Sequence, residues 1–269
     1  MSRTTSFARA AVRRAALIAD RVRPPADGLV VLIYHRVGGG STSAVDLAPE
    51  VFGEQMAQLA EWGTVLSLDH AVAELGAGHR PSGVVITFDD GAADFCDIAL
   101  PIMAEHRLSS TLYLVTSAPD AGTLPWGPPA ASWQALRDAS STGLVSVQSH
   151  THDHRLLHNA TAAVIAEQLD RSTEAIGTHL GHTAHHFAYP KAVAGNRTAR
   201  AAVAQRFRSA ALAGHRVNRS ADDLQRLGRV PVSRSDDMTT FRHKAGGGLH
   251  LEGFARDLYG HVRYRSART

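Results

Sequence analysis

The stretch Gly83-Val84-Val85-Ile86-Thr87-Phe88-Asp89-Asp90-Gly91 decides how the rest of the chain is interpreted. Its β-branched and apolar residues predict a buried strand that ends abruptly at two neighbouring carboxylates and a glycine. Two adjacent acids at the end of a buried strand are unfavourable unless a cation lies near them. The alternative, which this stretch taken alone favours, is an ordinary Asp-Gly turn in which Asp89 caps the next helix.

A second stretch, Ser149-His150-Thr151-His152-Asp153-His154, changes that balance. It follows the apolar run 144–147, so it too is expected where a strand gives way to a loop. Three histidines at alternate positions are hard to explain by core packing, because each buried imidazole needs its own hydrogen-bond partner. Imidazole and carboxylate ligands suit zinc or a similar divalent ion, and three protein ligands leave a position open for water. A metal site is therefore favoured over a solvated, histidine-rich loop.

These two stretches resemble the motifs of a known family. Thr87-Phe88-Asp89-Asp90-Gly91 resembles the TFDDG motif of the polysaccharide deacetylases, also called the NodB-homology group or carbohydrate esterase family 4. His150-Thr151-His152-Asp153-His154 is similar to the H-[ST]-x-x-H motif of the same family. The resemblance extends from about residue 29 to residue 232 and implies a distorted (β/α)7 barrel, similar to a TIM barrel.

The remaining pattern of the chain agrees with a barrel. Apolar runs that predict strands alternate with amphipathic stretches that predict helices, which is typical of parallel βαβ units in an α/β domain. We expect strands near 29–34, 65–68, 84–90, 111–115, 144–147, 186–190, 209–212 and 227–232, and a helix over 93–106. The residues with chemical potential follow strands, which is where an α/β barrel builds its active site.

Size and composition permit one domain of this kind. The chain has 269 residues, of which 44% are hydrophobic, enough for one sizeable core. A formal charge of +3 without basic clusters interleaved with aromatics gives no indication of a nucleic-acid partner. The single cysteine, Cys96, excludes an internal disulfide.

The N-terminal segment has a composition of its own. Residues 1–25 are rich in arginine and alanine and predict a basic helix or arm, ahead of a deacetylase-like domain over 26–269. Such a helix could lie peripherally on an anionic membrane surface or pack on the end of the barrel. No secretory signal or membrane span is evident, so the expected location is cytoplasmic, with peripheral contact at the inner membrane face as the variant of that expectation.

The family resemblance also implies roles for individual residues. Asp90, His150 and His154 would bind the metal, and Asp89 would be the general base. Zinc is the expected ion, with cobalt, nickel and manganese as alternatives. His152 is not a motif ligand and is expected to point away.

The general acid is assigned from a different resemblance. Tyr34-His35 resembles an N-terminal motif of the circularly permuted subgroup typified by poly-N-acetylglucosamine deacetylases, which implies that His35 is the acid. Leu249-His250-Leu251 is the competing candidate, because many members carry the acid in a C-terminal motif. A histidine that only satisfies a strand-end carbonyl is the third interpretation of His35.

Three further features complete the predicted site. Phe187-Ala188-Tyr189-Pro190-Lys191 resembles the third motif of the subgroup, in which the residue after the proline donates its N–H to the oxyanion. Ala188 stands where other members have an arginine that holds the catalytic aspartate, and Arg229 is a hypothetical replacement for it. Trp126, in a loop rich in proline and glycine, is expected either to stack on a sugar ring or to fasten the loop to the barrel.

The function that the resemblance implies is removal of N-acetyl groups from N-acetylated sugars, in a polysaccharide or a glycan precursor, by attack of metal-bound water. One alternative is hydrolysis of O-acetyl esters or small non-sugar amides at the same site. Another is a catalytically silent, carbohydrate-binding member of the family. The oligomeric state is left open by the sequence.

Overall fold

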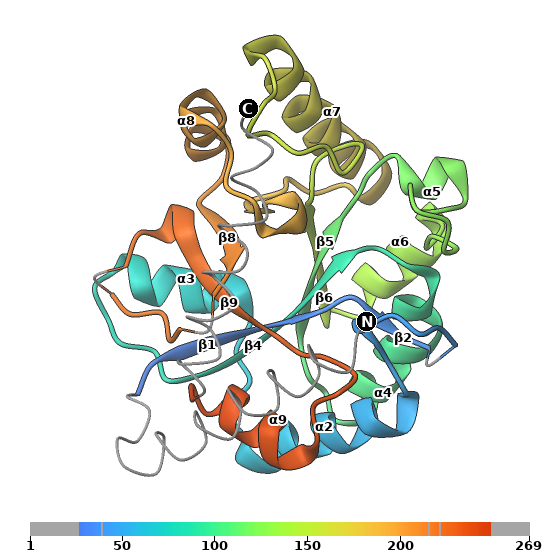
Figure 1. Ribbon diagram of the computed structural model, residues 1–269, viewed down its shortest axis with the longest axis vertical. Coiled ribbons are helices and arrows are strands. Elements are labelled where there is room, and N and C mark those ends of the chain that lie inside the picture. The colour runs from blue at the N-terminus through green and yellow to red at the C-terminus, as the bar shows by residue number, and fades with distance from the viewer. Residues whose placement is uncertain (1–26, 39, 215, 221, 249–269) are drawn as a thin grey trace, which may run out of the picture.

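The protein is described by a computed structural model that covers residues 27–38, 40–214, 216–220 and 222–248 (Figure 1). The predicted basic segment 1–25 and the candidate motif Leu249-His250-Leu251 both lie outside these residues. Within the described part of the chain, no helix is long and apolar enough to cross a membrane.

Seven parallel strands form a closed barrel in the order β1-β4-β5-β6-β7-β8-β9. The barrel closes where Leu32 of β1 pairs with Val230 of β9. The fold prediction is therefore confirmed: the structure is a single (β/α)7 barrel. The strands are β1 (Leu29–Tyr34), β4 (Gly83–Asp90), β5 (Ser110–Leu114), β6 (Val145–Ser149), β7 (His186–Ala188), β8 (Ser209–Ala213) and β9 (Leu227–Pro231).

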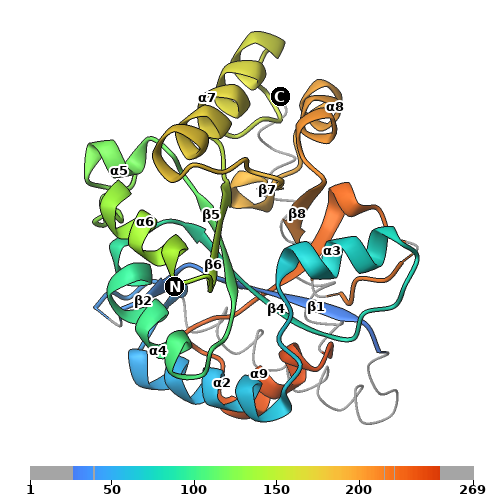
Figure 2. The ribbon, with the colours of Figure 1, turned by 180° about the vertical axis from the view of Figure 1, so that it is seen from behind.

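Helices cover the outside of the barrel, so that the strands are enclosed between them and the barrel interior (Figure 2). This explains why all six residues of β1 are buried, since one face of each strand packs inward and the other packs on helices. The helices are α2 (Pro49–Trp62), α3 (Leu68–Gly76), α4 (Leu100–Glu105), α5 (Ala118–Ala121), α6 (Trp133–Ser141), α7 (Ala162–Leu180), α8 (Arg197–Arg206) and α9 (Met238–Ala245). Shorter elements are β2 (Arg36–Val37) paired with β3 (Asp46–Leu47), and the helical turns η1 (Phe95–Ala99), η2 (Pro190–Ala192) and η3 (Leu224–Arg226).

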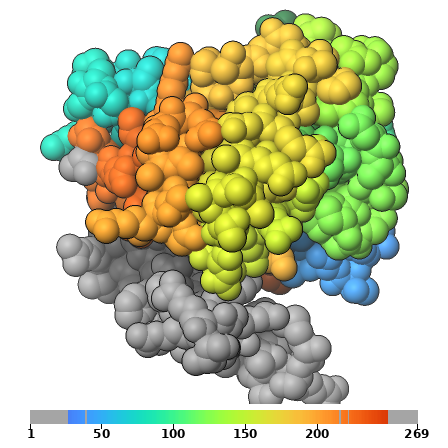
Figure 3. All heavy atoms as spheres, turned by 90° about the horizontal axis from the view of Figure 1, so that it is seen from above, coloured from blue at the N-terminus to red at the C-terminus, as the bar shows by residue number. Residues whose placement is uncertain are grey.

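Helix starts follow local side-chain chemistry. Ser67, Ser132 and Thr161 each accept a hydrogen bond from a backbone N–H in the first turn of α3, α6 and α7. Helix α7 lies between α6 and α8 on the outer surface, and the space-filling view shows it in yellow beside the orange α8 (Figure 3).

Two predicted elements differ from the structure. The expected strand at 65–68 is reduced to a single bridge between Val65 and Val84, because β5 occupies that edge of β4 from Ile86 onward and leaves only the start of the strand open. The expected helix over 93–106 is present over 93–105, but it is divided into the π-helical turn η1 and the helix α4. The division falls just before Pro101, which has no N–H to donate to the preceding turn.

Candidate active site

The two carboxylates end strand β4 at the carboxyl-terminal end of the barrel. Asp89 and Asp90 are both nearly buried, with 5% and 8% of their surface exposed. Asp90 has a left-handed backbone with φ of 77°, followed by Gly91 with φ of 91°. A Cβ atom at Gly91 would lie 2.4 Å from Leu114 Cδ1, so this turn requires glycine. The sharp turn separates the directions of the two neighbouring acids.

Asp90, His150 and His154 converge on one point. One ligand atom from each of the three residues lies within 4.8 Å of the others. The Asp90 carboxylate is 3.6 Å from His150 Nε2 and 3.5 Å from His154 Nε2. One carboxylate and two imidazoles form a donor set that suits zinc and leaves room for further ligands. These residues therefore fit a divalent metal ion.

Both histidines are prepared to act as neutral ligands. His150 Nδ1 lies 2.7 Å from the Ala188 carbonyl oxygen. Because a carbonyl only accepts, Nδ1 carries the proton and Nε2 is left free to bind an ion. Burial lowers the pKa of His150 to about 4 and that of His154 to about 3, so both are unprotonated at neutral pH. His152 lies outside this cluster, and its Nδ1 is 2.9 Å from Thr116 Oγ1.

The neighbouring acid, Asp89, is held by Arg229 of strand β9. Arg229 Nη1 and Nη2 donate to the two carboxylate oxygens at 2.6 and 2.8 Å, and the Arg229 side chain is fully buried. Burial by itself would raise the pKa of Asp89, but the charge of Arg229 outweighs it and the pKa lies well below its usual range. Among the described residues no arginine or lysine pairs with Asp90, and burial together with the charge of Asp89 raises its pKa in the absence of a cation. The two adjacent acids therefore have distinct environments.

Arg229 itself is positioned by two groups to which the sequence analysis gave no such role. Its guanidinium lies 5.0 Å from the centre of the Tyr113 ring, and its Nη1 is 3.2 Å from Thr87 Oγ1. Thr87 in turn donates to the Leu32 carbonyl at 2.6 Å. Thr87 belongs to the TFDDG motif, whereas nothing in the local sequence around Tyr113 indicates this role.

His35 follows strand β1 and is half-buried near the same end of the barrel. Burial lowers its pKa, and the opposing charges of Asp89 and Arg229 are close enough to influence it. Its Nδ1 atom is buried and has no hydrogen-bond partner among the described residues. A histidine whose role is to donate from Nδ1 to a strand-end carbonyl would have such a partner. The structure therefore disagrees with that interpretation of His35.

The turn after β7 carries the third predicted motif. The N–H of Tyr189 donates to the Ala211 carbonyl at 3.1 Å, that of Ala192 donates to Tyr189 at 2.9 Å, and Pro190 has no N–H. Within the described part of the chain, this leaves the Lys191 N–H as the amide of the turn without an assigned acceptor. The Tyr189 side chain is buried, while Lys191 is exposed and has a left-handed backbone with φ of 53°.

Trp126 lies beside the Asp90, His150 and His154 cluster. Its ring centre is 4.7 Å from that of His154, and the Trp126 side chain is 47% exposed. Of the two roles expected for Trp126, this exposure is compatible with stacking on a ligand, and the His154 contact is compatible with fastening the loop.

Strained backbone concentrates at this end of the barrel. Among the described residues, five of the six non-glycine residues with positive φ belong to the loops that carry the site, while Arg107 lies elsewhere. Such conformations are unfavourable and persist where surrounding contacts enforce them, which is common at functional sites. The five are Asp90, Thr151, His154, Lys191 and Ala192.

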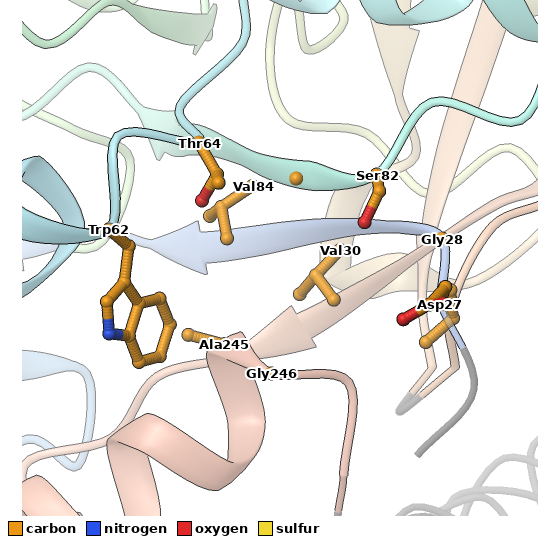
Figure 4. A pocket seen from close by; sticks show the side chains of 11 residues that line it. Asp27, Gly28, Val30, Trp62, Thr64, Ser82, Val84, Ala245 and Gly246 are labelled. Carbon is orange, nitrogen blue, oxygen red and sulfur yellow. The ribbon is translucent and has the colours of Figure 1, made fainter.

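A separate pocket lies at the opposite end of the barrel, near the amino-terminal ends of β1 and β4 (Figure 4). It has a volume of about 320 Å³ and is lined by Val30, Trp62, Val84 and Ala245, among others. None of the predicted site residues lines it.

Comparison with known proteins agrees with the fold. The fold together with the Asp-His-His cluster defines a NodB-type deacetylase barrel. Residues 77–210, about half of the chain, match the family model described as polysaccharide deacetylase. The protein therefore belongs to the polysaccharide deacetylase family. A search of curated protein sequences found no match.

Solved structures of the same fold cover most of the chain. IcaB from Ammonifex degensii is 26% identical with a TM-score of 0.70, covering 84% of this chain and 98% of that one. The Streptococcus pyogenes deacetylase PplD, solved in complex with acetate, is 20% identical with a TM-score of 0.74, covering 82% and 99%. A de-N-acetylase from Aggregatibacter actinomycetemcomitans is 18% identical with a TM-score of 0.68, covering 80% and 99%. The last two likenesses bear on the fold alone.

Proposed function

We propose that this protein is a metal-dependent hydrolase that removes N-acetyl groups from N-acetylated sugars, either in a polysaccharide or in a glycan precursor. The observation that carries the proposal is the convergence of Asp90, His150 and His154 directly beside an Asp89 carboxylate that Arg229 keeps ionised. Family membership supports deacetylation as the reaction class. The N-acetyl substrate and the metal requirement are parts of the proposal.

Asp90, His150 and His154 would hold the ion, for which zinc is the best match to the donors. A divalent ion bound there would polarise the acyl carbonyl and lower the pKa of a bound water. Ion binding requires free Nε2 atoms on the histidines, which the Ala188 hydrogen bond to His150 and the burial of both rings favour. It also requires an unprotonated carboxylate at Asp90, which the positive charge of the bound ion would itself stabilise.

Asp89 is the proposed general base, which takes a proton from the attacking water. Arg229 occupies both of its oxygens, so the carboxylate is ionised and its orientation is set before substrate binds. The Asp89 carboxylate also lies 4.0 Å from His150 Nε2, which places the base next to the ligand set.

His35 is the proposed general acid, which protonates the departing amine. Because burial lowers its pKa, His35 is neutral at pH 7 in the free protein, and the proton it delivers has to be acquired during the reaction. We infer that Asp89, whose negative charge raises the His35 pKa, passes on the proton that it takes from water. The N–H of Lys191 is the proposed donor to the developing oxyanion.

Trp126 is the proposed platform for the sugar ring, since a half-exposed indole beside His154 offers an apolar face next to the reacting group. This assignment favours a carbohydrate over a small non-sugar amide, which would leave that face unused.

The test is acetate release from chitin-type and β-1,6-linked N-acetylglucosamine oligomers. The protein would be compared after chelation, after restoration with zinc or cobalt, and as Asp89→Asn. We expect release that depends on metal and is abolished by the substitution. Tight metal binding without release from either oligomer would contradict the proposed substrate, and release from the chelated protein would contradict the proposed metal dependence.

A further inference from the structure

Helix α7 buries two polar side chains within an otherwise apolar face. Its buried residues are Ile165, Gln168, Leu169, Ser172 and Ile176. Ile165, Leu169 and Ile176 pack in the hydrophobic cluster around Phe187. Gln168 and Ser172 are four residues apart and therefore lie on the same side of the helix. Buried polar groups need partners, so the contacts of these two residues indicate what they do.

Gln168 directs both ends of its amide at one residue. Its Nε2 donates to Asp153 Oδ2 at 2.8 Å, and its Oε1 accepts the backbone N–H of Asp153 at 2.9 Å. Only 3% of Gln168 is exposed, so solvent competes little for these bonds. Asp153 immediately precedes His154, and its other oxygen lies 3.6 Å from His152 Nε2.

Ser172 makes the second contact, to the start of the same loop. Its Oγ lies 2.6 Å from the Oγ of Ser149, and both residues are fully buried. Ser149 immediately precedes His150. Helix α7 therefore contacts the residue before each of the two histidine ligands.

The loop between these contacts needs such support. Thr151 and His154 have left-handed backbones, with φ of 68° and 57°, which non-glycine residues adopt only when neighbouring contacts enforce them. A loop released from α7 would relax toward unstrained conformations, and the two histidines would no longer converge with Asp90.

We propose that Gln168 and Ser172 are positioning residues, which hold loop 150–154 in the conformation that brings His150 and His154 together with Asp90. They act through the loop and do not touch the reacting atoms. The inference rests on the metal site of the proposed function, but it concerns ion binding and loop order rather than the substrate.

The test exchanges donor and acceptor between Gln168 and Asp153. Gln168→Glu removes the Nε2 donor and places a second carboxylate against Asp153, and at pH 8 we expect zinc affinity to fall by about 10-fold to 100-fold. Asp153→Asn keeps an acceptor for Gln168. The double variant Gln168→Glu/Asp153→Asn restores a donor and an acceptor with exchanged roles, and we expect its zinc affinity to return to within about threefold of wild type.

The matched control is Gln134→Glu in α6. Gln134 also donates to an aspartate, with Nε2 at 2.8 Å from Asp138 Oδ1, but this pair is exposed and both of its residues belong to α6. Its zinc affinity, measured by calorimetry, is expected to equal that of wild type. The visible spectrum of the cobalt-loaded proteins reports whether the ligand geometry changes together with affinity.

Amide hydrogen exchange of residues 150–154, measured without metal, separates this inference from the proposed function. We expect faster exchange in Gln168→Glu and recovery of the wild-type rate in the double variant. We also expect faster exchange in Ser172→Ala, which removes only one oxygen. This second variant keeps the test valid if Gln168→Glu fails to fold. The inference would be overturned if Gln168→Glu and Ser172→Ala both kept wild-type exchange and zinc affinity. It would also be overturned if the double variant were as impaired as Gln168→Glu. Absence of acetate release from a wild-type protein that binds zinc would instead count against the proposed function.

Discussion

Arg229 and Asp89 form a buried bidentate ion pair across the interior of the barrel, with nitrogen to oxygen distances of 2.6 and 2.8 Å. The pair joins β9 to β4, which are separated by β1 in the sheet and by 140 residues in the chain. This contact agrees with the hypothesis that Arg229 holds Asp89, since Ala188 has no side chain that could do so. The ion pair therefore both connects distant strands and determines the ionisation of the proposed base.

Arg229→Met should raise the pKa of Asp89, because the main group that lowers it is removed. We expect the acid limb of the pH profile of kcat/KM to move to higher pH.

The wild-type pair of Arg229 and Asp89 also contributes stability that is present above the ordinary carboxyl pKa and is lost as pH falls through the lowered pKa of Asp89. Leaving that carboxylate buried and unpaired should reduce the free energy of unfolding at pH 7 by about 3–5 kcal/mol, as measured in urea. Arg171→Met, which breaks an exposed pair with Glu167, is the control and should change it by less than about 1 kcal/mol. An unchanged acid limb would contradict the proposed role of Arg229.

Asp89→Asn should lower kcat by about 10²-fold to 10⁴-fold, because an amide cannot accept the proton from water. Zinc affinity should change little, since Asp90, His150 and His154 are all retained. Calorimetry and acetate release measured on the same preparation check both parts. Asp97→Asn on the exposed surface serves as the control. A parallel loss of zinc binding would mean that Asp89 is a ligand rather than the base.

His35→Gln should impair amide hydrolysis more than hydrolysis of an activated ester. A departing amine needs a proton, whereas the 4-nitrophenolate that leaves 4-nitrophenyl acetate does not. We expect a loss of about 10²-fold or more with the N-acetylated oligomer and a much smaller loss with the ester. Equal losses with both substrates would show that His35 acts otherwise than by protonating the leaving group.

Trp126→Ala should weaken oligosaccharide binding. Loss of one stacked ring should raise KM by about tenfold, which corresponds to about 1.4 kcal/mol. Trp62→Ala is the matched control, because Trp62 is also partly exposed but lies at the pocket on the opposite end of the barrel. An unchanged KM in Trp126→Ala would leave fastening of the loop as the role of this residue.

Amine-reactive labelling should distinguish the two lysines of the chain, Lys191 and Lys244. Lys191 is exposed beside the site, whereas Lys244 is fully buried and donates to Asp236 at 2.6 Å and to Pro231 at 2.9 Å. Peptide mass spectrometry after reductive methylation should find Lys191 modified and Lys244 unmodified. Oligosaccharide should protect Lys191 if the turn after β7 borders the substrate. Equal modification of both lysines would indicate that helix α9 opens from the barrel.

Much of this site follows from local sequence. An apolar, β-branched strand that runs into Asp89-Asp90-Gly91, and a second strand that runs into His150 to His154, indicate both the chemistry and its place at strand ends. Parallel strands bring their carboxyl ends to one edge, so two such motifs in one barrel are expected to meet, and Asp90, His150 and His154 do so. These features depend on neighbouring residues and strand direction, which the sequence carries.

Tertiary structure alone decided which distant groups serve the site. Arg229 could be only a hypothesis, because its contact with Asp89 depends on how β9 closes against β1. Tyr113, Gln168 and Ser172 had no distinguishing local pattern, since an inward side chain on a strand or a polar residue on a helix face has many potential partners. Their roles arise from register and packing between elements far apart in the chain. The sequence thus determined the residue types of the site and their places at strand ends. The contacts that hold each of these groups were determined by the closure of the barrel and by the packing of α7 against it.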